Sequence, residues 1–361
     1  MADMKTIGKK WLWPLALAAL LMIICGLCLL GYKSRADMLL SQQAAERWRG
    51  ENETPFAQIS CFMPVGGSLS EEEIYNFRTA MVTKLTEASF EVTADTPLIH
   101  DAWCGFGKAT ISNGQRRGDV QVTAVGGNFF DFHPIKLVSG NYLSPDDLME
   151  DRVLLDRECA WLLFGGEELT GMSFQINGQP YYVAGVIERE TDKFSQKALG
   201  DTMGIYMSWQ GWKKLSEDAG ISCYELVMAE PVEGFCYRAV TEKFPIGRGE
   251  IVDNTYRYEP ERILKMLKDG SDRSMRLSEA SYPYWENAAR AVEDSCLVWL
   301  VAALVAGLMP AVLLLYFAIK ALVYSKAKLE DEYVPSAREK LSEAWRVRAR
   351  KRWEKKNPGK K

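Results

Sequence analysis

The sequence predicts an α+β domain held between two membrane-spanning helices. The chain has 361 residues, and its apolar residues are concentrated in two uncharged runs, Trp11 to Tyr32 and Cys296 to Ile319. Between these runs, segments with the β-branched and aromatic content of strands alternate with segments of helical periodicity. The overall composition is ordinary for a folded protein, with 47% hydrophobic and 25% charged residues.

Both apolar runs are long enough to cross a bilayer. About 20 apolar residues, at roughly 1.5 Å per residue, span a hydrocarbon core of about 30 Å. The first run is longer than the apolar region of a signal peptide, about 7–15 residues, so we expect a retained anchor and not a cleaved leader. We therefore place transmembrane helices at 11–32 and 296–324.

The distribution of charge orients the chain. Lysines precede the first span, and the segment 325–361 contains thirteen Lys and Arg against six Asp and Glu, a net charge of +7. Because Lys and Arg accumulate on the cytoplasmic side of a membrane, we expect 1–10 and 325–361 in the cytoplasm. Residues 33–295 then lie outside the cytoplasm.

The segment outside is acidic. The whole chain carries −4, and the termini and spans together carry +10, so residues 33–295 carry −14. This charge argues against a nucleic-acid partner, because nucleic acids are bound through basic surfaces. The basic tail suits contact with anionic lipid headgroups, which makes membrane lipid one expected partner.

The outer segment begins with a helical stalk over 36–50 and a strand over 55–65. A helix over 68–89 follows, in which Ser70 caps the first turn and the acidic residues 71–73 favour the positive end of the helix dipole. A strand over 90–97 completes this β-α-β unit.

The pattern changes near Lys108 and changes back near Gly204. Asn113-Gly114 and Asn177-Gly178 predict two hairpins, because Asn-Gly is the preferred pair for tight hairpin turns. We therefore expect a bilobal domain with a hairpin-rich lobe at about 108–204. The other predicted elements are strand-to-helix segments at 152–165, 204–218 and 223–244, a strand at 249–256 and helices at 261–270 and 284–295.

Three of the eight cysteines lie in or beside the spans: Cys25, Cys28 and Cys296. Cys25 and Cys28 form a C-x-x-C pair, but hydrocarbon disfavours the thiolate that a redox dithiol needs. A packing role is therefore favoured for them.

The other five cysteines lie outside, where disulfides persist. The spacing of Cys223 and Cys236 suits a strand joined to the start of the following helix, so we expect a disulfide between them. Cys61–Cys104 is the second candidate pair. Because five is odd, at least one outer cysteine is unpaired within the chain.

The sequence carries no enzymatic motif. It has no G-x-x-x-x-G-K-[ST] loop, no G-x-S-x-G elbow and no H-E-x-x-H pair. His133, before a proline, reads as a turn residue and not as a ligand. The stretch "CGFGKAT" lacks the third glycine of a phosphate-binding loop and reads as an ordinary loop. We expect no enzyme activity, no catalytic or metal-binding residues and no cofactor.

The order of elements and motifs resembles the extracytoplasmic core domain of MacB-type ABC transporter permeases, relatives of which include FtsX-like and lipoprotein-release permeases. The likeness covers about residues 10–320, and it implies a location in a bacterial inner or plasma membrane. The residues that carry it are Val125, Gly127, Phe129, Phe130, Leu137, Gly140, Leu143, Asp146, Leu163-Phe164-Gly165, Gly171, Asn177-Gly178, Tyr182-Val183 and Gly185-Val186-Ile187.

The resemblance implies that the outer domain moves with the membrane helices when an ABC ATPase closes in the cytoplasm. Family permeases have four spans, whereas only two are found here, so the resemblance leaves three forms open: a half-permease, a subunit of a split system or a regulatory relative. The expected partners are an ABC ATPase, a full-length permease subunit, or both, and an oligomer is compatible with this arrangement. The alternative is a membrane-anchored scaffold that docks and regulates a cell-envelope partner without transport.

The second span carries a candidate helix-packing face. Gly307 and the small residue Ala303 permit close approach of another helix, and Pro310 supplies a kink in the same helix. Two helices do not enclose a hydrophilic path, so we expect this face to serve assembly with a membrane partner.

Overall fold

The structure is a computed structural model that describes residues 2–50, 54–64, 66–88, 98–144, 147–269, 280–328 and 334–356. The chain divides into two compact units. One unit comprises Met1–Leu30 and Trp299–Lys361, and the other is Gly31–Val298.

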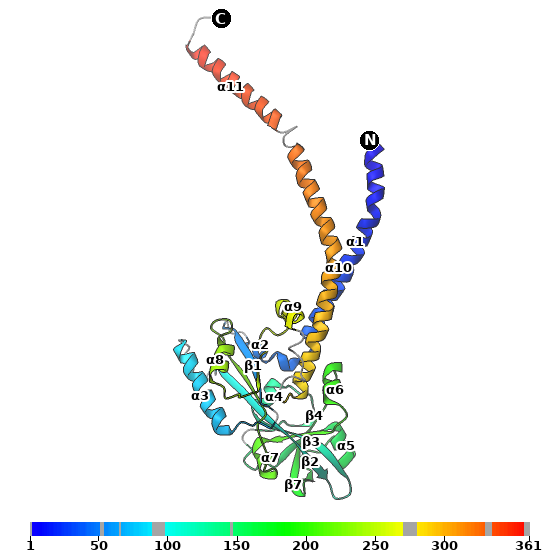
Figure 1. Cartoon of the computed structure of the whole chain (residues 1–361), viewed down its shortest axis with the longest axis vertical. Helices are drawn as coiled ribbons and strands as arrows, with labels where there is room; N and C mark the ends of the chain where they lie inside the picture. The colour runs from blue at the N-terminus through cyan, green and yellow to red at the C-terminus, as the bar shows by residue number, and fades with distance from the viewer. Residues whose placement is uncertain are drawn as a thin grey trace. The chain divides into compact units, whose positions relative to one another are not determined.

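Three helices dominate the first unit: α1 (Ala2–Ala36), α10 (Tyr284–Lys328) and α11 (Val334–Lys356). In α1 and α10, the stretches Trp13–Ala36 and Tyr284–Ala327 are long and apolar enough to cross a membrane (Figure 1). The helix predicted at 284–295 is not separate, because α10 continues from it through Pro310 without interruption. No turn residue lies between the two predicted segments, so the helical pattern simply carries on.

The second unit is built on one mixed sheet. Its strand order is β10-β1-β9-β2-β3-β8-β5-β7-β4, and β6 pairs with β2 and β7. The pairs β3·β8 and β5·β7 are parallel, and the other pairs are antiparallel. The strands are β1 (Phe56–Phe62), β2 (Ile99–Ser112), β3 (Arg117–Gly127), β4 (Leu137–Gly140), β5 (Arg152–Asp156), β6 (Ser173–Ile176), β7 (Gln179–Ile187), β8 (Gly204–Ser208), β9 (Cys223–Ala229) and β10 (Glu250–Asp253).

The α+β prediction is confirmed, and the two lobes share this sheet. Strands β1, β2, β9 and β10 form one half, and β3 to β8 lie in the other half. The long hairpin of β2 and β3 joins the halves, turning between Ser112 and Arg117 as the Asn-Gly signal predicts. The second predicted hairpin is formed by β6 and β7, with Asn177 and Gly178 both at positive φ.

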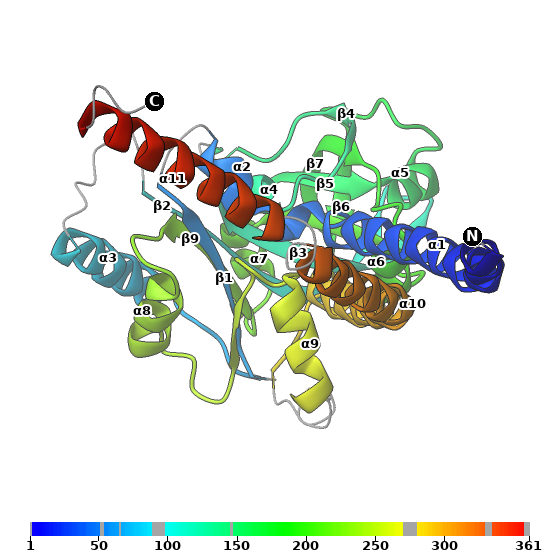
Figure 2. The same cartoon turned by 90° about the horizontal axis from the view of Figure 1, so that it is seen from above.

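Helices cover both faces of the sheet, which explains why every residue of β1 and β9 is buried. On one face lie α3 (Glu71–Glu87), α5 (Arg157–Leu163), α7 (Trp209–Leu215) and α8 (Phe235–Lys243), with α3 and α8 side by side in Figures 1 and 2. The opposite face carries α2 (Ala44–Arg49), α4 (Phe129–Phe132) and the first turns of α10. The remaining helices are η1 (Leu40–Gln42), α6 (Lys193–Leu199) and α9 (Pro260–Asp269).

Three local predictions have different outcomes. The predicted stalk over 36–50 is broken into η1 and α2, and the strand predicted at 90–97 lies outside the described residues.

The "CGFGKAT" stretch is part of β2 and not a loop. Gly107 is required there because a Cβ would lie 2.1 Å from the Trp212 ring of α7. This glycine therefore makes room for helix packing.

Candidate functional site

The sheet face beneath α10 carries buried polar side chains where an apolar core would be expected. On β1, Gln58 accepts a hydrogen bond from the Ala44 amide at 2.9 Å and donates to the Ser41 carbonyl at 2.7 Å. Gln58 therefore fixes the segment that follows α1 to the sheet. Residues two apart on a strand share a face, so Ser60 lies on the same side as Gln58.

Arg257 is the centre of a buried ionic cluster at the start of α10, which we call the Arg257 clamp. Its guanidinium donates to both carboxylate oxygens of Glu286 at 2.6 and 2.8 Å and to Glu293 at 2.8 Å. It also donates to Gln42 of η1 at 3.2 Å. The clamp thus joins the segment after α1, the loop after β10 and two turns of α10.

The buried charges of the clamp stabilise one another. Burial alone lowers the pKa of Arg257, but the Glu286 and Glu293 carboxylates raise it well above its ordinary value. Arg290 also donates to Glu286 at 2.7 Å and to Glu250 of β10 at 2.8 Å. Buried charges are tolerated when they are paired and hydrogen-bonded in this way.

Hydrogen bonds extend from the clamp into the sheet. Arg257 donates to Asn254 at 2.9 Å, Asn254 donates to Ser60 at 2.8 Å, and Ser60 donates to Glu225 of β9 at 2.9 Å. Glu225 pairs in turn with the Nε2 atom of His133, which lies at the end of α4. A continuous buried polar chain therefore runs from α10 to the middle of the sheet.

Trp285 is the aromatic anchor of α10 in the domain. It is buried, and its ring centroid lies 4.3 Å from that of His133, 5.8 Å from Phe129 and 5.9 Å from Phe106. Phe129 belongs to α4, His133 is the residue that ends α4, and Phe106 belongs to β2. Large aromatic side chains dominate packing energies, so this contact holds the first turn of α10 on the sheet.

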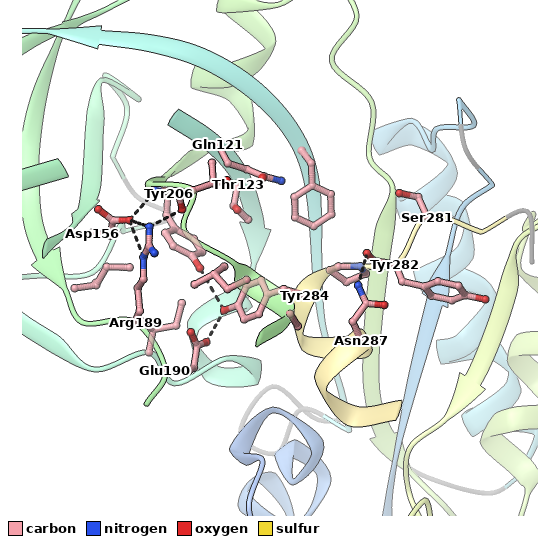
Figure 3. A pocket seen from close by; sticks show the side chains of 18 residues that line it. Gln121, Thr123, Asp156, Arg189, Glu190, Tyr206, Ser281, Tyr282, Tyr284 and Asn287 are labelled. Atoms are coloured by element: carbon pink, nitrogen blue, oxygen red, sulfur yellow. Dashed lines mark hydrogen bonds and ion pairs between the residues drawn. The ribbon is translucent and has the colours of Figure 1, made fainter. Parts of the chain in front are cut away.

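A cavity of about 260 Å³ lies next to this anchor, between the second half of the sheet and residues 281–287. Figure 3 shows Tyr284 between Tyr206 of β8 and Glu190; the two tyrosine hydroxyls are 3.4 Å apart, and Tyr284 donates to Glu190. Burial, followed by the charge of Glu190, raises the pKa of Tyr206, so its hydroxyl stays protonated.

Asp156 organises the far wall of the cavity. One carboxylate oxygen caps α5 by accepting from the Cys159 amide at 2.7 Å, and the other accepts from Arg189 at 2.7 Å and from the Gly204 amide at 2.6 Å. The carboxylate is therefore satisfied by structural partners. Within the described residues, no group of three or more His, Cys, Asp or Glu side chains is arranged to hold a metal ion.

Together these contacts form one joint between the sheet and the segments at the start of α10 and after α1. Arg257, Glu286 and Trp285 attach α10 to the sheet through ionic and aromatic contacts, and Gln42 and Gln58 attach the segment after α1. Removing one partner of a buried ion pair costs about 3–5 kcal/mol, so loss of a clamp residue should weaken this attachment. The polar groups of these contacts are hydrogen-bonded to one another.

The predicted Cys223–Cys236 disulfide is absent from the structure. All eight cysteines lie within the described residues and all are free, including the second predicted pair, Cys61 and Cys104. The Cys236 thiol points at the Ala229 carbonyl, 3.3 Å away, whereas Cys223 lies opposite Cys104 on the neighbouring strand. Sequence spacing placed both residues near one loop but did not show which way each side chain points.

The small residues of the second span lie toward the chain's own first helix. Ala303, Ala306 and Pro310 are buried, and a Cβ on Gly307 would lie 3.4 Å from Cys25 Sγ of α1. The exposed face of α10 is made instead of large apolar side chains such as Leu308. We therefore propose that Ala303, Gly307 and Pro310 pack α10 against α1, and that a membrane partner meets the opposite face.

Replacing Gly307 with Leu should weaken the α1–α10 contact by about 1–3 kcal/mol, because the larger side chain meets Cys25. Proximity can be tested with Gly307→Cys in the full chain, followed by mild oxidation and mass spectrometry of non-reduced peptides. A cross-link to Cys25 is expected. Leu308→Cys, on the exposed face, is the matched control, and equal cross-linking of both variants would contradict this packing.

Sequence reasoning missed the residues of the clamp and the role of His133. One signal was present: Glu286 and Glu293 are seven residues apart, so both lie on the same face of a helix with Ala289 and Val292. Carboxylates in an otherwise apolar helical stripe indicate a buried cation. Its identity as Arg257 required the fold, because Arg257 comes from a loop after β10.

The fold defines an α+β domain that lies in the chain between two helices long and apolar enough to cross a membrane. The chain belongs to the family of MacB-like periplasmic core domains, the model of which matches residues 35–233. It is therefore a periplasmic-type core domain of an ABC transporter permease, with two candidate transmembrane helices.

Solved structures of the same kind are similar to this chain at low identity. The extracellular domain of the noncanonic ABC-type transporter YknZ from Gram-positive bacteria has 14% identity and a TM-score of 0.37, covering 52% of this chain and 92% of its own. The periplasmic region of MacB from Actinobacillus actinomycetemcomitans has 14% identity and a TM-score of 0.38, covering 64% and 99%.

A domain of a putative permease protein from Porphyromonas gingivalis has 10% identity and a TM-score of 0.34, with 59% and 99% covered. No curated protein matches the chain. The family assignment rests on the match over residues 35–233.

The motif residues that matched the family have structural roles. Gly140 in β4 has φ +78°, and a Cβ there would lie 2.3 Å from the Ala184 carbonyl of β7. Phe129 is buried against His133 and Trp285 beneath α10. The motif therefore builds the sheet edge and the floor of the joint, while Asp146 lies outside the described residues.

Proposed function

We propose that this chain is a non-enzymatic membrane subunit of an ABC-transporter-like system, in which the outer domain relays motion of the membrane helices. The observation that carries the proposal is the Arg257 clamp, which attaches the domain-side turns of α10 and the segment after α1 to one sheet. Movement of either helix is therefore imposed on the sheet and, through the β2–β3 hairpin, on the second lobe.

The charge distribution indicates how the chain is oriented across the membrane. The basic tail is cytoplasmic in this proposal, and helix α11 presents Trp345 and Trp353 as exposed side chains among many Lys and Arg residues. Such a helix suits the anionic inner surface of the membrane. Both termini then lie where an ABC ATPase acts, and the acidic domain lies outside.

The experiment that tests the proposal uses photo-crosslinking from the exposed face of α10. A photoreactive side chain at Leu308 should capture a polytopic permease subunit or an ATPase that contains a phosphate-binding loop, identified by mass spectrometry. The matched control is Ala303, which is buried and should capture the chain's own α1. The transporter role is wrong if the chain stays monomeric, captures neither protein, and its deletion leaves the ATPase activity of those membranes unchanged.

The second candidate function is a membrane-anchored scaffold that binds an envelope partner. It is favoured by exposed apolar side chains on the second lobe, where Leu148 is 93% and Met149 is 72% exposed. Neighbouring apolar residues of this size that face solvent are typical of protein-binding surfaces. If Leu148→Ser with Met149→Ser abolishes a partner interaction while photo-crosslinking at Leu308 finds no transporter component, the scaffold role is supported.

A further inference from the structure

Two of the five outer cysteines face each other across the sheet. Cys104 of β2 and Cys223 of β9 are directly opposite in the antiparallel register, and each is 1% exposed. Directly opposite residues project from the same face, with Cα atoms about 4.5–5.5 Å apart. A disulfide needs a Cα separation of about 4.4–6.8 Å, so this pair can close with little backbone movement.

The other three outer cysteines have different surroundings. Cys61 lies opposite Tyr224, on the face that carries α3 and α8. The Cys159 thiol lies 3.6 Å from the Gly204 carbonyl. The Cys236 thiol lies beside the backbone carbonyls of β9.

We propose that Cys104 and Cys223 form a cross-strand disulfide in the outer domain, while Cys61, Cys159 and Cys236 remain thiols. This rests on the extracytoplasmic location in the proposed function, because disulfides persist outside the cytoplasm. The assignment also accounts for the odd number of outer cysteines: one pair and three single buried thiols.

The cross-link forms while the domain folds. Burial raises the pKa of both thiols, so the folded sheet holds them in the unreactive protonated form. Before the sheet closes, one deprotonated thiol attacks an oxidising disulfide of the glutathione or protein class and releases one thiol of that oxidant. The second cysteine then attacks the mixed disulfide, forms the Cys104–Cys223 bond and releases the other thiol, so that two cysteine thiols are oxidised and one disulfide is reduced.

The position of the pair links it to the joint. Cys223 is two residues before Glu225 on β9 and therefore shares its face, beneath Trp285. A bond from Cys223 to β2 ties the strand that carries the polar chain to the hairpin that enters the second lobe. The cross-link would hold β2 and β9, two neighbouring strands of the first half of the sheet, at a fixed separation beneath Trp285.

The test is a thiol map of the full chain. Cells that export the protein are quenched in acid, and the denatured chain is alkylated before and after reduction. Six of the eight cysteines should react without reduction, and Cys104 and Cys223 should react only after it. Reaction of both residues without reduction, or a disulfide that joins either residue to another cysteine, would overturn the proposal.

Stability provides the second readout, measured on the folded full chain in detergent. Reduction should lower the thermal unfolding midpoint of the outer domain by on the order of 10 °C, because the closed loop exceeds about 100 residues. Cys104→Ala and Cys223→Ala should each abolish this dependence, whereas the matched control Cys159→Ala should retain it. A midpoint that does not respond to reduction counts against the cross-link. Neither the thiol map nor the unfolding midpoint depends on a transporter partner. A failure of the relay function would therefore be detected separately, by the photo-crosslinking at Leu308.

Discussion

Replacing Arg257 with Met should destabilise the outer domain by about 3–5 kcal/mol, because it breaks a buried ion pair from one side only. The change leaves the Glu293 carboxylate without its guanidinium partner and removes the link between α10 and Gln42. Glu286 is still paired with Arg290, so the loss should be felt most at Glu293 and at the segment after α1. The measurement is the free energy of unfolding of the full chain in detergent, from urea titration.

Two controls separate this effect from a general loss of charge. Arg262→Met removes a partly exposed partner of Asp253 and should cost no more than about 1 kcal/mol. Adding Glu293→Gln to Arg257→Met should recover part of the lost stability, because it removes a buried carboxylate that has lost its Arg257 partner. Equal losses for the Arg257 and Arg262 variants would show that the clamp does not hold α10.

Truncating Trp285 to Ala should cost about 3–5 kcal/mol and detach the first turn of α10 from the sheet. The ring packs among Phe106, Phe129 and His133, so its removal would leave a cavity in the core. Hydrogen exchange of residues 284–298 should become faster, whereas exchange in β5 and β7 should change little. This localised change reports on coupling and not only on global stability.

Trp161 offers a matched control for the tryptophan. Its side chain is 53% exposed on α5, so Trp161→Ala should alter stability by no more than about 1 kcal/mol. In the relay function, Trp285→Ala should also uncouple partner-dependent motion of the domain while leaving the captured partner at Leu308 unchanged. If Trp285→Ala leaves the exchange of 284–298 unaltered, the anchor lies elsewhere.

The sequence predicted the elements with strong local signals correctly. The Ser70 cap, the two Asn-Gly hairpins and the strand-to-helix segments are all present in the structure. These features depend on neighbours a few residues away, so they can be read from a single chain. The two apolar helices were recognisable for the same reason, because length and composition alone decide whether a helix can cross a bilayer.

Contacts that depend on the direction of side chains could not be predicted from the sequence. Cys223 and Cys236 are close in sequence, but Cys223 lies in β9 opposite Cys104 of β2, a strand more than a hundred residues earlier. His133 ends α4 and precedes a proline, which is a local signal. Its partner Glu225 is far along the chain, so the pairing was not visible in the sequence.

The sequence by itself determined the class of the protein: an acidic α+β domain between two apolar helices with a basic tail, in the family of MacB-like periplasmic core domains. Periodicity, turn residues and charge distribution are local or additive properties, so they can be read from the sequence without knowledge of the fold. Only the tertiary structure decided which residues meet. The Arg257 clamp, the Trp285 anchor and the Cys104–Cys223 pair each join segments distant in sequence, because strand order and register determine such contacts and neither is encoded in local composition.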